Sequence, residues 1–430
     1  MKVAFFTLGC KVNQYETNAM AEQFEKNGYE IVSYEQKADI YIINTCTVTS
    51  ISDKKSRQMI RKSKTLNPNA IIAAVGCYAQ TARQELEKIQ EIDLILGNHE
   101  KKDIVEFIEN YAADSQHIAV ADLMQEKEFD DFGEVTYTDK TRAVIKIQDG
   151  CDRFCSYCII PYARGRVRSR KIESVRKEVE KIAALGIKEI VMTGIHIASY
   201  GKDFKENITL MDLLQEVNKI EGILRIRLGS LEPTLMTEEF VKKLKELDKI
   251  CNHFHLSLQS GCNDTLKRMN RKYTTEEFKQ STLLLRKYFP NVLLTTDIIV
   301  GFPGETKEEF DKTYEFLKTI KFYRMHVFKY SKRTGTKACE MENQVPEKEK
   351  EERSRKLINL SDETEREYEE SYIDREIDVL FEEEEGNFLK GHTANYMMIY
   401  VKKDECIKKL LNAVKIQKRE NEKLIGNVIQ

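Results

Sequence analysis

The chain has 430 residues, of which 41% are hydrophobic and 33% charged, and its formal net charge is −2 at pH 7. No apolar run reaches the roughly 18 residues that a transmembrane helix needs, so we expect no membrane partner. Because the net charge is close to zero, a nucleic acid would have to bind at local basic segments. A chain of this length is expected to form two or three domains.

The N-terminal segment is apolar over residues 1–8 but short, and it runs into Gly9-Cys10-Lys11 without a small-residue cleavage site. We therefore expect a first strand in place of an export signal, and a cytoplasmic protein. The ten cysteines then indicate metal binding or catalysis, because the cytosol keeps thiols reduced and disulfides are rare there.

The first part of the chain alternates apolar runs with amphipathic stretches. The apolar runs predict buried parallel strands at residues 3–8, 40–44, 71–76 and 94–97, and crossover helices are expected at 13–26, 53–64, 82–89 and 102–111. This pattern is typical of a doubly wound α/β domain, which we place at residues 1–113. A polar connection follows it.

Two further parts are expected. Strands at residues 144–148, 189–193, 225–229, 255–259, 295–300 and 326–330, with helices at 172–185, 209–219, 237–247, 275–287 and 307–319, predict a partial (β/α)6 barrel over residues 137–367. Residues 347–370 are dense in Glu, Lys and Arg and predict a solvated helix. Short β-like runs at 377–381, 388–391, 396–401 and 424–428 predict a small all-β barrel over residues 368–430. The predicted fold class is therefore α/β, with three domains.

Cys151, Cys155 and Cys158 form a C-x3-C-x2-C run directly after a predicted barrel strand. Three thiolates on one tight loop can bind three irons of a cubane cluster and leave the fourth iron open to a substrate. A structural zinc site is the alternative, but it is closed by four ligands, and the local sequence offers no fourth Cys or His. We therefore predict an iron–sulfur cluster on this loop.

Cys10, Cys46 and Cys77 each follow a predicted parallel strand of the first domain. Parallel strands of one sheet end on the same edge, so these thiols are expected to converge at the crevice where doubly wound sheets bind ligands. One buried cysteine can be a small hydrophobe by chance, but three in this position favour a second open cluster. Gly9 and Gly76 would let the backbone turn closely around it.

Two basic segments are expected to contact RNA. Residues 162–171 follow the cysteine loop and alternate arginines with other residues; the arginines can hold phosphates, with a solvated surface as the alternative. Residues 386–430 carry nine Lys and Arg against four Asp and Glu within a predicted small barrel. The residues predicted to contact RNA are Tyr162, Arg164, Arg166, Arg168, Arg170 and Tyr396.

The C-x3-C-x2-C run resembles the motif of the radical S-adenosylmethionine superfamily, with Tyr157 in the aromatic position before the last cysteine. The resemblance implies a 4Fe-4S cluster whose open iron holds S-adenosylmethionine, which one electron cleaves to a 5′-deoxyadenosyl radical. Residues 192–196 lack the acidic residue that the superfamily often has at the end of this strand. For Ser230 and Glu305, capping of the following helix is the alternative role. The implied cofactor-binding residues are Tyr157, Gly194, Ser230, Gln259, Asp297, Gly301 and Glu305.

Both cysteine sets together resemble the methylthiotransferase family over essentially the whole chain. The runs LGCKVNQYET at residues 8–17, NTCTVT at 44–49 and YSKRTGT at 330–336 are similar to its MtaB branch, and GHTANY at 391–396 is similar to a TRAM module. Relatives that act on isopentenyladenosine or on a ribosomal protein differ in the residues after the first cysteine. The resemblance implies transfer of a methylthio group to C2 of N6-threonylcarbamoyladenosine next to the tRNA anticodon. It also implies two 4Fe-4S clusters, two molecules of S-adenosylmethionine per turnover, and an electron donor such as flavodoxin or ferredoxin.

Other functions stay open. The nearest alternative is a methylthiotransferase for isopentenyladenosine in tRNA or for a ribosomal protein side chain. A noncatalytic metal-containing RNA-binding protein is an alternative from another class. The remaining thiols are expected to be packing or surface residues, with the second of them near the active-site rim: Cys251, Cys262, Cys339 and Cys406.

Overall fold

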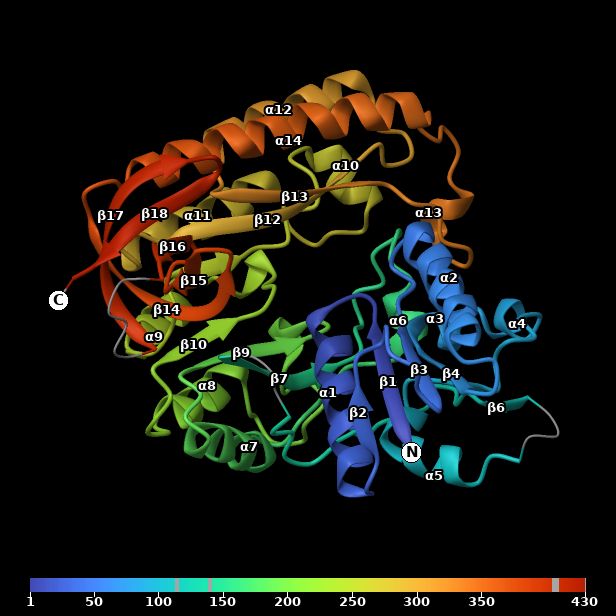
Figure 1. The fold of residues 1–430 in the computed structure, drawn as a ribbon. Helices are drawn as coiled ribbons and strands as arrows, with labels where there is room; N and C mark the ends of the chain where they lie inside the picture. Colours follow the sequence, from blue (N-terminus) through green and yellow to red (C-terminus); the bar gives the residue numbers. More distant parts are fainter. Residues whose placement is uncertain (113–115, 138–140, 404–409, 430) are drawn as a thin grey trace.

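The structure is a computed structural model that describes residues 1–112, 116–137, 141–403 and 410–429. An N-terminal α/β domain, a central partial barrel and a small C-terminal β-barrel follow one another along the chain (Figure 1). The predicted fold class is confirmed. Within these residues, no helix is long and apolar enough to cross a lipid bilayer.

The N-terminal domain is built on parallel strands in the order β2-β1-β3-β4-β5-β6. They are β1 (Lys2–Thr7), β2 (Glu30–Val32), β3 (Ile40–Thr45), β4 (Ile71–Gly76), β5 (Leu94–Leu96) and β6 (His117–Ala119). The strand order reverses between β1 and β3, and doubly wound sheets bind ligands outside the strand ends at such a reversal. The sheet also includes β6, so it extends beyond residue 113, the predicted end of this domain.

Helices cover both faces of this sheet. They are α1 (Lys11–Lys26), α2 (Ser50–Leu66), α3 (Cys77–Thr81), α4 (Arg83–Leu86) and α5 (Ile104–Glu109), with the 3-10 turn η1 (Glu100–Asp103). Alternate residues of β3 point to opposite faces, so Tyr41 and Ile43 belong to one apolar cluster while Ile40 and Ile42 belong to the other. This double burial explains why β3 appears in the sequence as a continuous apolar run.

The central domain is an open barrel of six parallel strands. They are β7 (Arg142–Asp149), β9 (Glu189–Gly194), β10 (Arg225–Leu228), β11 (His253–His255), β12 (Leu293–Val300) and β13 (Arg324–Lys329). Single bridges from Ile226 to Ile250 and from Leu231 to Leu256 join the β10 side to the β11 side. At the other side of β7 lies the short antiparallel strand β8 (Arg168–Ser169), so among the described strands the barrel stays open between β7 and β13.

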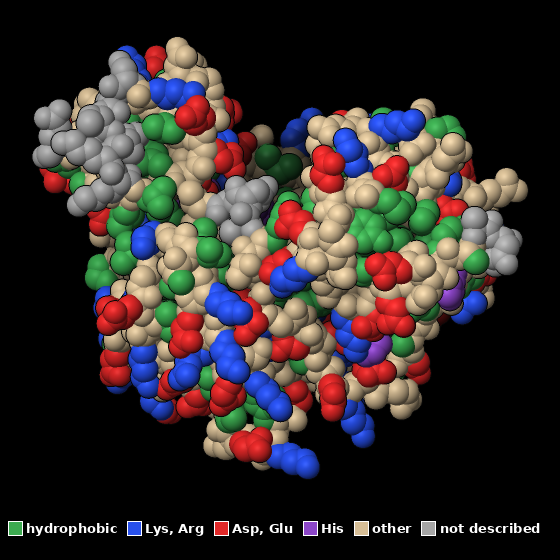
Figure 2. All heavy atoms as spheres, turned by 60° about the horizontal axis from the view of Figure 1, so that its bottom comes forward, with side chains coloured by type: hydrophobic (Ala, Val, Ile, Leu, Met, Phe, Trp, Pro, Cys, Tyr) green, Lys and Arg blue, Asp and Glu red, His purple; other side chains and the backbone are tan. Residues whose placement is uncertain are grey.

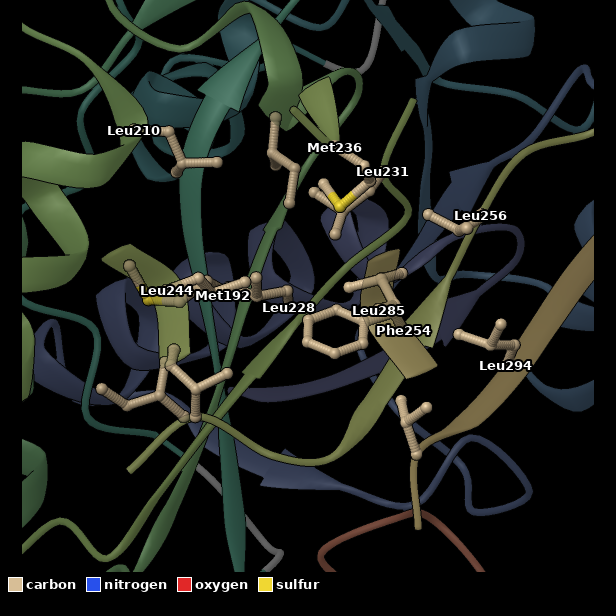
Figure 3. Close-up of a cluster of buried hydrophobic side chains, with 14 of the residues drawn as sticks. Met192, Leu210, Leu228, Leu231, Met236, Leu244, Phe254, Leu256, Leu285 and Leu294 are labelled. Atoms are coloured by element: carbon tan, nitrogen blue, oxygen red, sulfur yellow. The ribbon is translucent and has the colours of Figure 1, made fainter. Parts of the chain in front are cut away.

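Helices surround this barrel and bury its outer face. They are α6 (Ile160–Arg164), α7 (Ile172–Ala184), α8 (Leu210–Asn218), α9 (Glu238–Lys245), α10 (Asn263–Arg268), α11 (Thr275–Tyr288), α12 (Lys307–Ile320) and α13 (Lys337–Glu340), with the turns η2 (Ile197–Ser199) and η3 (Pro233–Leu235). Capping boxes start α8, α11 and α12. Strand residues such as Met192, Leu228 and Phe254 pack with helix residues such as Leu244 and Leu285 (Figure 3).

Helix α14 (Glu347–Glu370) crosses the molecule beside α12 and leads to the C-terminal barrel (Figure 1). The helix is confirmed, but its prediction as a solvated helix is wrong on one face, because Leu357 and Leu360 lie in the central core. The closed C-terminal barrel has the order β14-β15-β16-β18-β17, formed by β14 (Glu376–Glu385), β15 (Phe388–Thr393), β16 (Met398–Lys402), β17 (Leu411–Glu420) and β18 (Lys423–Val428). Arg225 and Arg227 of β10 donate hydrogen bonds to its backbone carbonyls, which fixes this barrel against the central domain.

Candidate active site

The structure brings the three N-terminal cysteines to one edge of the sheet. Cys10 caps α1 after β1, Cys46 follows β3, and Cys77 opens α3 after β4, and these three strands are direct neighbours. Gly9 has φ +103°, and a Cβ there would lie 2.9 Å from Cys46 Sγ, so only glycine lets the Cys10 loop approach Cys46 this closely. The predicted convergence follows directly from parallel pairing.

Two of these thiols lie in a protein environment that disfavours free thiolates. Burial raises the pKa of Cys46 to about 11, and the neighbouring Cys77 thiol adds to the shift. Desolvation also raises the pKa of Cys10, an effect that the Arg164 guanidinium opposes. The Asn98 amide donates a hydrogen bond to Cys77 Sγ at 3.7 Å. A bound cation would therefore be needed to keep Cys10 and Cys46 ionised.

Cys151, Cys155 and Cys158 lie together on the loop after β7. The loop is held by its neighbours: Asn270 donates to the Phe154 carbonyl at 3.0 Å, and Phe154 has φ +46°. Arg271 donates to Cys155 Sγ at 3.3 Å, and the Arg153 backbone donates to Cys151 Sγ at 3.5 Å. Burial raises the pKa of Cys151 to about 11 and that of Cys158 to about 12. A bound metal cation would therefore be needed here too to keep these two thiols ionised.

Each triad offers three thiolates, one fewer than the four ligands that close a structural zinc site. Among the described residues, the sulfur atoms of neither triad all lie within 4.8 Å of one another. Three thiolates are the donor set that leaves one iron of a cubane cluster open.

A buried carboxylate beside the cysteine loop was missed from the sequence. Glu232 is 2% exposed and lies 3.3 Å from His196 Nε2 and 3.6 Å from Arg271, and it also pairs with Arg153. Burial acts against its charge, but the hydrogen bond from His196 and the two arginines lower the pKa of Glu232 to about 2. Glu232 lies three residues after the predicted strand 225–229 and close to Ser230, which was predicted to bind the cofactor. Its position after a strand end could therefore have identified it from the sequence.

Two cavities lie at the strand ends and inside the barrel. The first, which we call the loop cavity, has a volume of about 220 Å³ and is lined by both domains: Val48, Thr49, Tyr157, Cys158, Gln259 and Asp297. The second, the inner cavity, has a volume of about 280 Å³ and is lined by all three domains, including Lys11, Arg227, Ser230, His253, Asp297 and Tyr396. The two cavities share Asp297 and therefore lie on either side of this residue.

The predicted cofactor residues fall into two groups. Tyr157, Gln259 and Asp297 line the loop cavity, and Ser230 lines the inner cavity. The other three lie against protein: Glu305 accepts from the Gly301 backbone at 3.1 Å and pairs with Arg353 of α14 at 2.6 Å, and a Cβ on Gly194 would meet Gln148 at 2.9 Å. Cofactor binding by Gly194, Gly301 and Glu305 stays a prediction without a cavity to support it.

The RNA prediction is corrected for three arginines. Arg164, Arg168 and Arg170 are at most 1% exposed. Arg164 pairs with Glu16 and Asp149, and Arg170 pairs with Glu178 at 2.5 Å, so neither guanidinium is available to a phosphate.

The same segment leaves two residues on the surface. Tyr162 is 46% exposed, and the Arg166 side chain is 51% exposed. Tyr396 lies in the inner cavity, where its ring stacks on His253 and His392. On the face shown in Figure 2, basic and acidic side chains are interspersed. This face therefore has no single large basic surface, and RNA would have to bind it at a few local sites.

The buried arginines instead join the two cysteine sites. Glu16 of α1 pairs with Arg164 and Lys146 at 2.8 Å and with Lys101 at 2.6 Å. Burial opposes its charge, but these cations hold the pKa of Glu16 well below its usual range. Arg164 ends α6, which directly follows the cysteine loop, so this network ties α1 and Cys10 to that loop. Cys251 and Cys262 are buried and Cys339 is partly buried, while Cys406 lies outside the described residues.

The barrel and its cysteine loop define a radical S-adenosylmethionine enzyme. Residues 145–317 match the radical SAM superfamily, and residues 2–97 match a family described as uncharacterized protein family UPF0004. The fold is similar to that of the radical S-adenosylmethionine methyltransferase TsrM from Kitasatospora setae, with a TM-score of 0.57 and 16% identity over 79% of this chain and 77% of that chain. Membership of this superfamily implies a 4Fe-4S cluster and S-adenosylmethionine.

Relatives that match nearly the whole chain show which kind of radical S-adenosylmethionine enzyme it resembles. The chain is 46% identical to the threonylcarbamoyladenosine tRNA methylthiotransferase MtaB of Bacillus subtilis, over 97% of this chain and 94% of that protein. It is 44% identical to MtaB of Aquifex aeolicus, over 89% and 93%. It is 36% identical to the tRNA-2-methylthio-N(6)-dimethylallyladenosine synthase of Clostridium tetani, over 100% and 97%. The chain belongs to the radical S-adenosylmethionine methylthiotransferase family.

Proposed function

We propose that this protein is a tRNA methylthiotransferase that attaches a methylthio group to C2 of N6-threonylcarbamoyladenosine next to the anticodon. One observation carries the proposal: the loop after Cys46 and the loop that contains Cys158 line the same cavity. Sulfur insertion at an unactivated aromatic carbon needs a radical source and a sulfur donor within reach of one substrate. The relatives named MtaB, at 40–46% identity, support the threonylcarbamoyl substrate over the dimethylallyl one.

In this proposal Cys151, Cys155 and Cys158 hold the superfamily's 4Fe-4S cluster. When bound, the cluster and S-adenosylmethionine supply a 5′-deoxyadenosyl radical that can take the hydrogen from C2. Arg271 and Arg153 offset the charge of the thiolates through their contacts with Cys155 and Cys151. Tyr157, Gln259 and Asp297 form the cavity wall that positions the cofactor and excludes water.

The N-terminal triad is proposed to hold a second 4Fe-4S cluster that carries the sulfur to be transferred. Its donor set of three thiols matches that of the barrel triad, and Asn98 and Arg164 provide the hydrogen bond and the positive charge that stabilise thiolates. A second molecule of S-adenosylmethionine would supply the methyl group. We also propose a cytoplasmic location and a small flavin or iron–sulfur electron donor, such as flavodoxin or ferredoxin.

The tRNA is proposed to approach beside the cysteine loop. Tyr162 and Arg166 are exposed there, and each of them contacts Phe154 of the loop, with a ring separation of 5.9 Å for Tyr162 and a guanidinium-to-ring distance of 4.9 Å for Arg166. The C-terminal barrel is proposed to act as a TRAM-type RNA-binding domain.

Anaerobic reconstitution followed by nucleoside mass spectrometry tests the proposal. The protein should bind iron and acid-labile sulfide, release 5′-deoxyadenosine under reductant, and convert threonylcarbamoyladenosine in an anticodon stem-loop to its 2-methylthio derivative. Zinc in place of iron, or a product confined to isopentenyladenosine or to a ribosomal protein, would contradict it.

A further inference from the structure

The wall of the inner cavity carries more positive than negative charge. Three cationic side chains line it, Lys11, Arg227 and Arg324, together with one carboxylate, Asp297. Three histidines complete the polar wall, and burial lowers the pKa of His253 well below its usual value, so that this ring is neutral at pH 7. The cavity therefore offers three cationic side chains and the neutral His253 ring to a guest, a combination that suits an anionic group.

Lys11 is the cation that the protein does not neutralise. Arg227 pairs with Glu189 at 2.7 Å, Arg324 pairs with Glu365, and Asp297 lies 3.1 Å from His255 Nε2. Among the residues that the structure describes, Lys11 has no ion-pair or hydrogen-bond partner, and two of its charged neighbours are Arg227 and Arg142. Glu189 also acts on Lys11 electrostatically, without forming an ion pair with it. Because Lys11 is exposed on the cavity wall, its ammonium group is open to an anionic guest.

Lys11 also lies at a chemically useful position. It directly follows Cys10, so its side chain extends into the inner cavity from the loop that carries the proposed sulfur-transfer cluster. A substrate group held by Lys11 would therefore be fixed relative to the transferred sulfur. The cavity volume of about 280 Å³ is near the lower end of small-molecule sites, roughly 300 Å³, which suits a substituent of a base better than a whole nucleotide.

We propose that Lys11 determines substrate specificity by binding the carboxylate of the N6-threonylcarbamoyl group in the inner cavity. This inference rests on the proposed function. An isopentenyl group has no polar atom, so in the same position it would leave the Lys11 ammonium desolvated and unpaired. Sites built to bind a polar group reject analogues that lack it by factors of roughly 10⁴.

Binding measurements on the reconstituted protein test this role without turnover. Lys11→Met should raise the Kd of an anticodon stem-loop bearing threonylcarbamoyladenosine by about 10- to 100-fold, while Lys11→Arg should stay within a few-fold of the wild type. Lys26→Met, at the far end of α1, is the matched control and should bind normally. Iron content should be the same in all four proteins.

A modified substrate removes the same charge without changing the protein. The methyl ester of the threonylcarbamoyl stem-loop should bind the wild type about 10- to 100-fold more weakly than the acid, but Lys11→Met should bind acid and ester equally. If the wild type binds acid and ester equally, the inference is overturned, whether or not the variant folds.

The proposed function and this inference fail in different ways. A wild-type enzyme that modifies the isopentenyladenosine stem-loop but not the threonylcarbamoyl one would contradict the function itself. A wild type that prefers the threonylcarbamoyl stem-loop, with a Lys11→Met variant of unchanged preference and full iron content, would leave the function standing and refute the role of Lys11.

Discussion

The two cysteine triads are assembled by different routes. Cys151, Cys155 and Cys158 come from one loop after one strand, so their spacing along the chain sets their spacing in space. Cys10, Cys46 and Cys77 come from three loops, and the parallel pairing of β1, β3 and β4 alone brings them together. The barrel triad thus depends on a local loop, while the N-terminal triad depends on the integrity of a whole sheet.

Separate removal of one cysteine from each triad should give the largest effects. Cys155→Ala should abolish 5′-deoxyadenosine formation, because its cluster would lose a ligand. Cys46→Ala should keep 5′-deoxyadenosine formation but abolish methylthio transfer, since only the proposed sulfur-carrying cluster is lost. Each variant should lose about half of the iron and sulfide of the wild type.

Cys339→Ala is the matched control for both substitutions, because this partly buried thiol belongs to neither triad. It should retain full iron content and full activity. Equal loss of 5′-deoxyadenosine in Cys46→Ala and Cys155→Ala would show that the two triads are not separate sites.

The network that joins the two sites should dominate stability. Glu16→Gln would leave Arg164, Lys101 and Lys146 with one carboxylate fewer in a fully buried setting, so we expect a loss of roughly 3–5 kcal/mol. The midpoint of chemical denaturation measures it. Glu25→Gln, on the exposed face of the same helix, should change stability by less than about 0.5 kcal/mol, and an equal shift in both variants would contradict a central role for the network.

Gly9 tests how tightly the N-terminal triad is packed. Gly9→Ala places a Cβ 2.9 Å from Cys46 Sγ at a φ of +103°, so iron at the N-terminal site should fall while 5′-deoxyadenosine formation continues. Gly28→Ala has a similar φ of +80° but open space around the new Cβ, so it should cost only about 1 kcal/mol of stability and no iron. Normal iron content in Gly9→Ala would show that the loop can move away from Cys46.

The sequence predicts those features that local patterns determine. The spacing of Cys151, Cys155 and Cys158 and the strand ends before Cys10, Cys46 and Cys77 were sufficient to place both triads. The alternating arginines of residues 164–170 misled the RNA prediction, because Glu16, the partner of Arg164, lies far away in the chain, and Glu178, the partner of Arg170, lies on the following helix. No local pattern distinguishes Arg166, whose ion pair with Asp152 lies at the surface, from arginines whose ion pairs are buried.

Long-range contacts also hid part of the site. Arg271 reaches Cys155 from a loop more than 100 residues further along the chain, and Lys11 meets Arg227 and Tyr396 only because three domains surround the inner cavity. Helix α14 looked solvated because its buried apolar residues, such as Leu357, are scattered among charged ones, some of which are also buried. Such positions become visible only when the domains are assembled.

The smallest expected effect separates the exposed arginine from its buried neighbours. Arg166→Ala should weaken tRNA binding a few-fold and reduce the salt dependence by about one counterion, because its half-exposed side chain can reach a phosphate. Arg168→Ala should instead lower stability, because Arg168 is 1% exposed and donates to the Arg164 carbonyl at 3.0 Å. Binding titrations at several salt concentrations, alongside denaturation midpoints, separate the two. The contrary result would be the same reduced salt dependence in both variants and no loss of stability. The buried segment would then have to open on RNA binding, and the distinction between the exposed Arg166 and the buried Arg168 would be wrong.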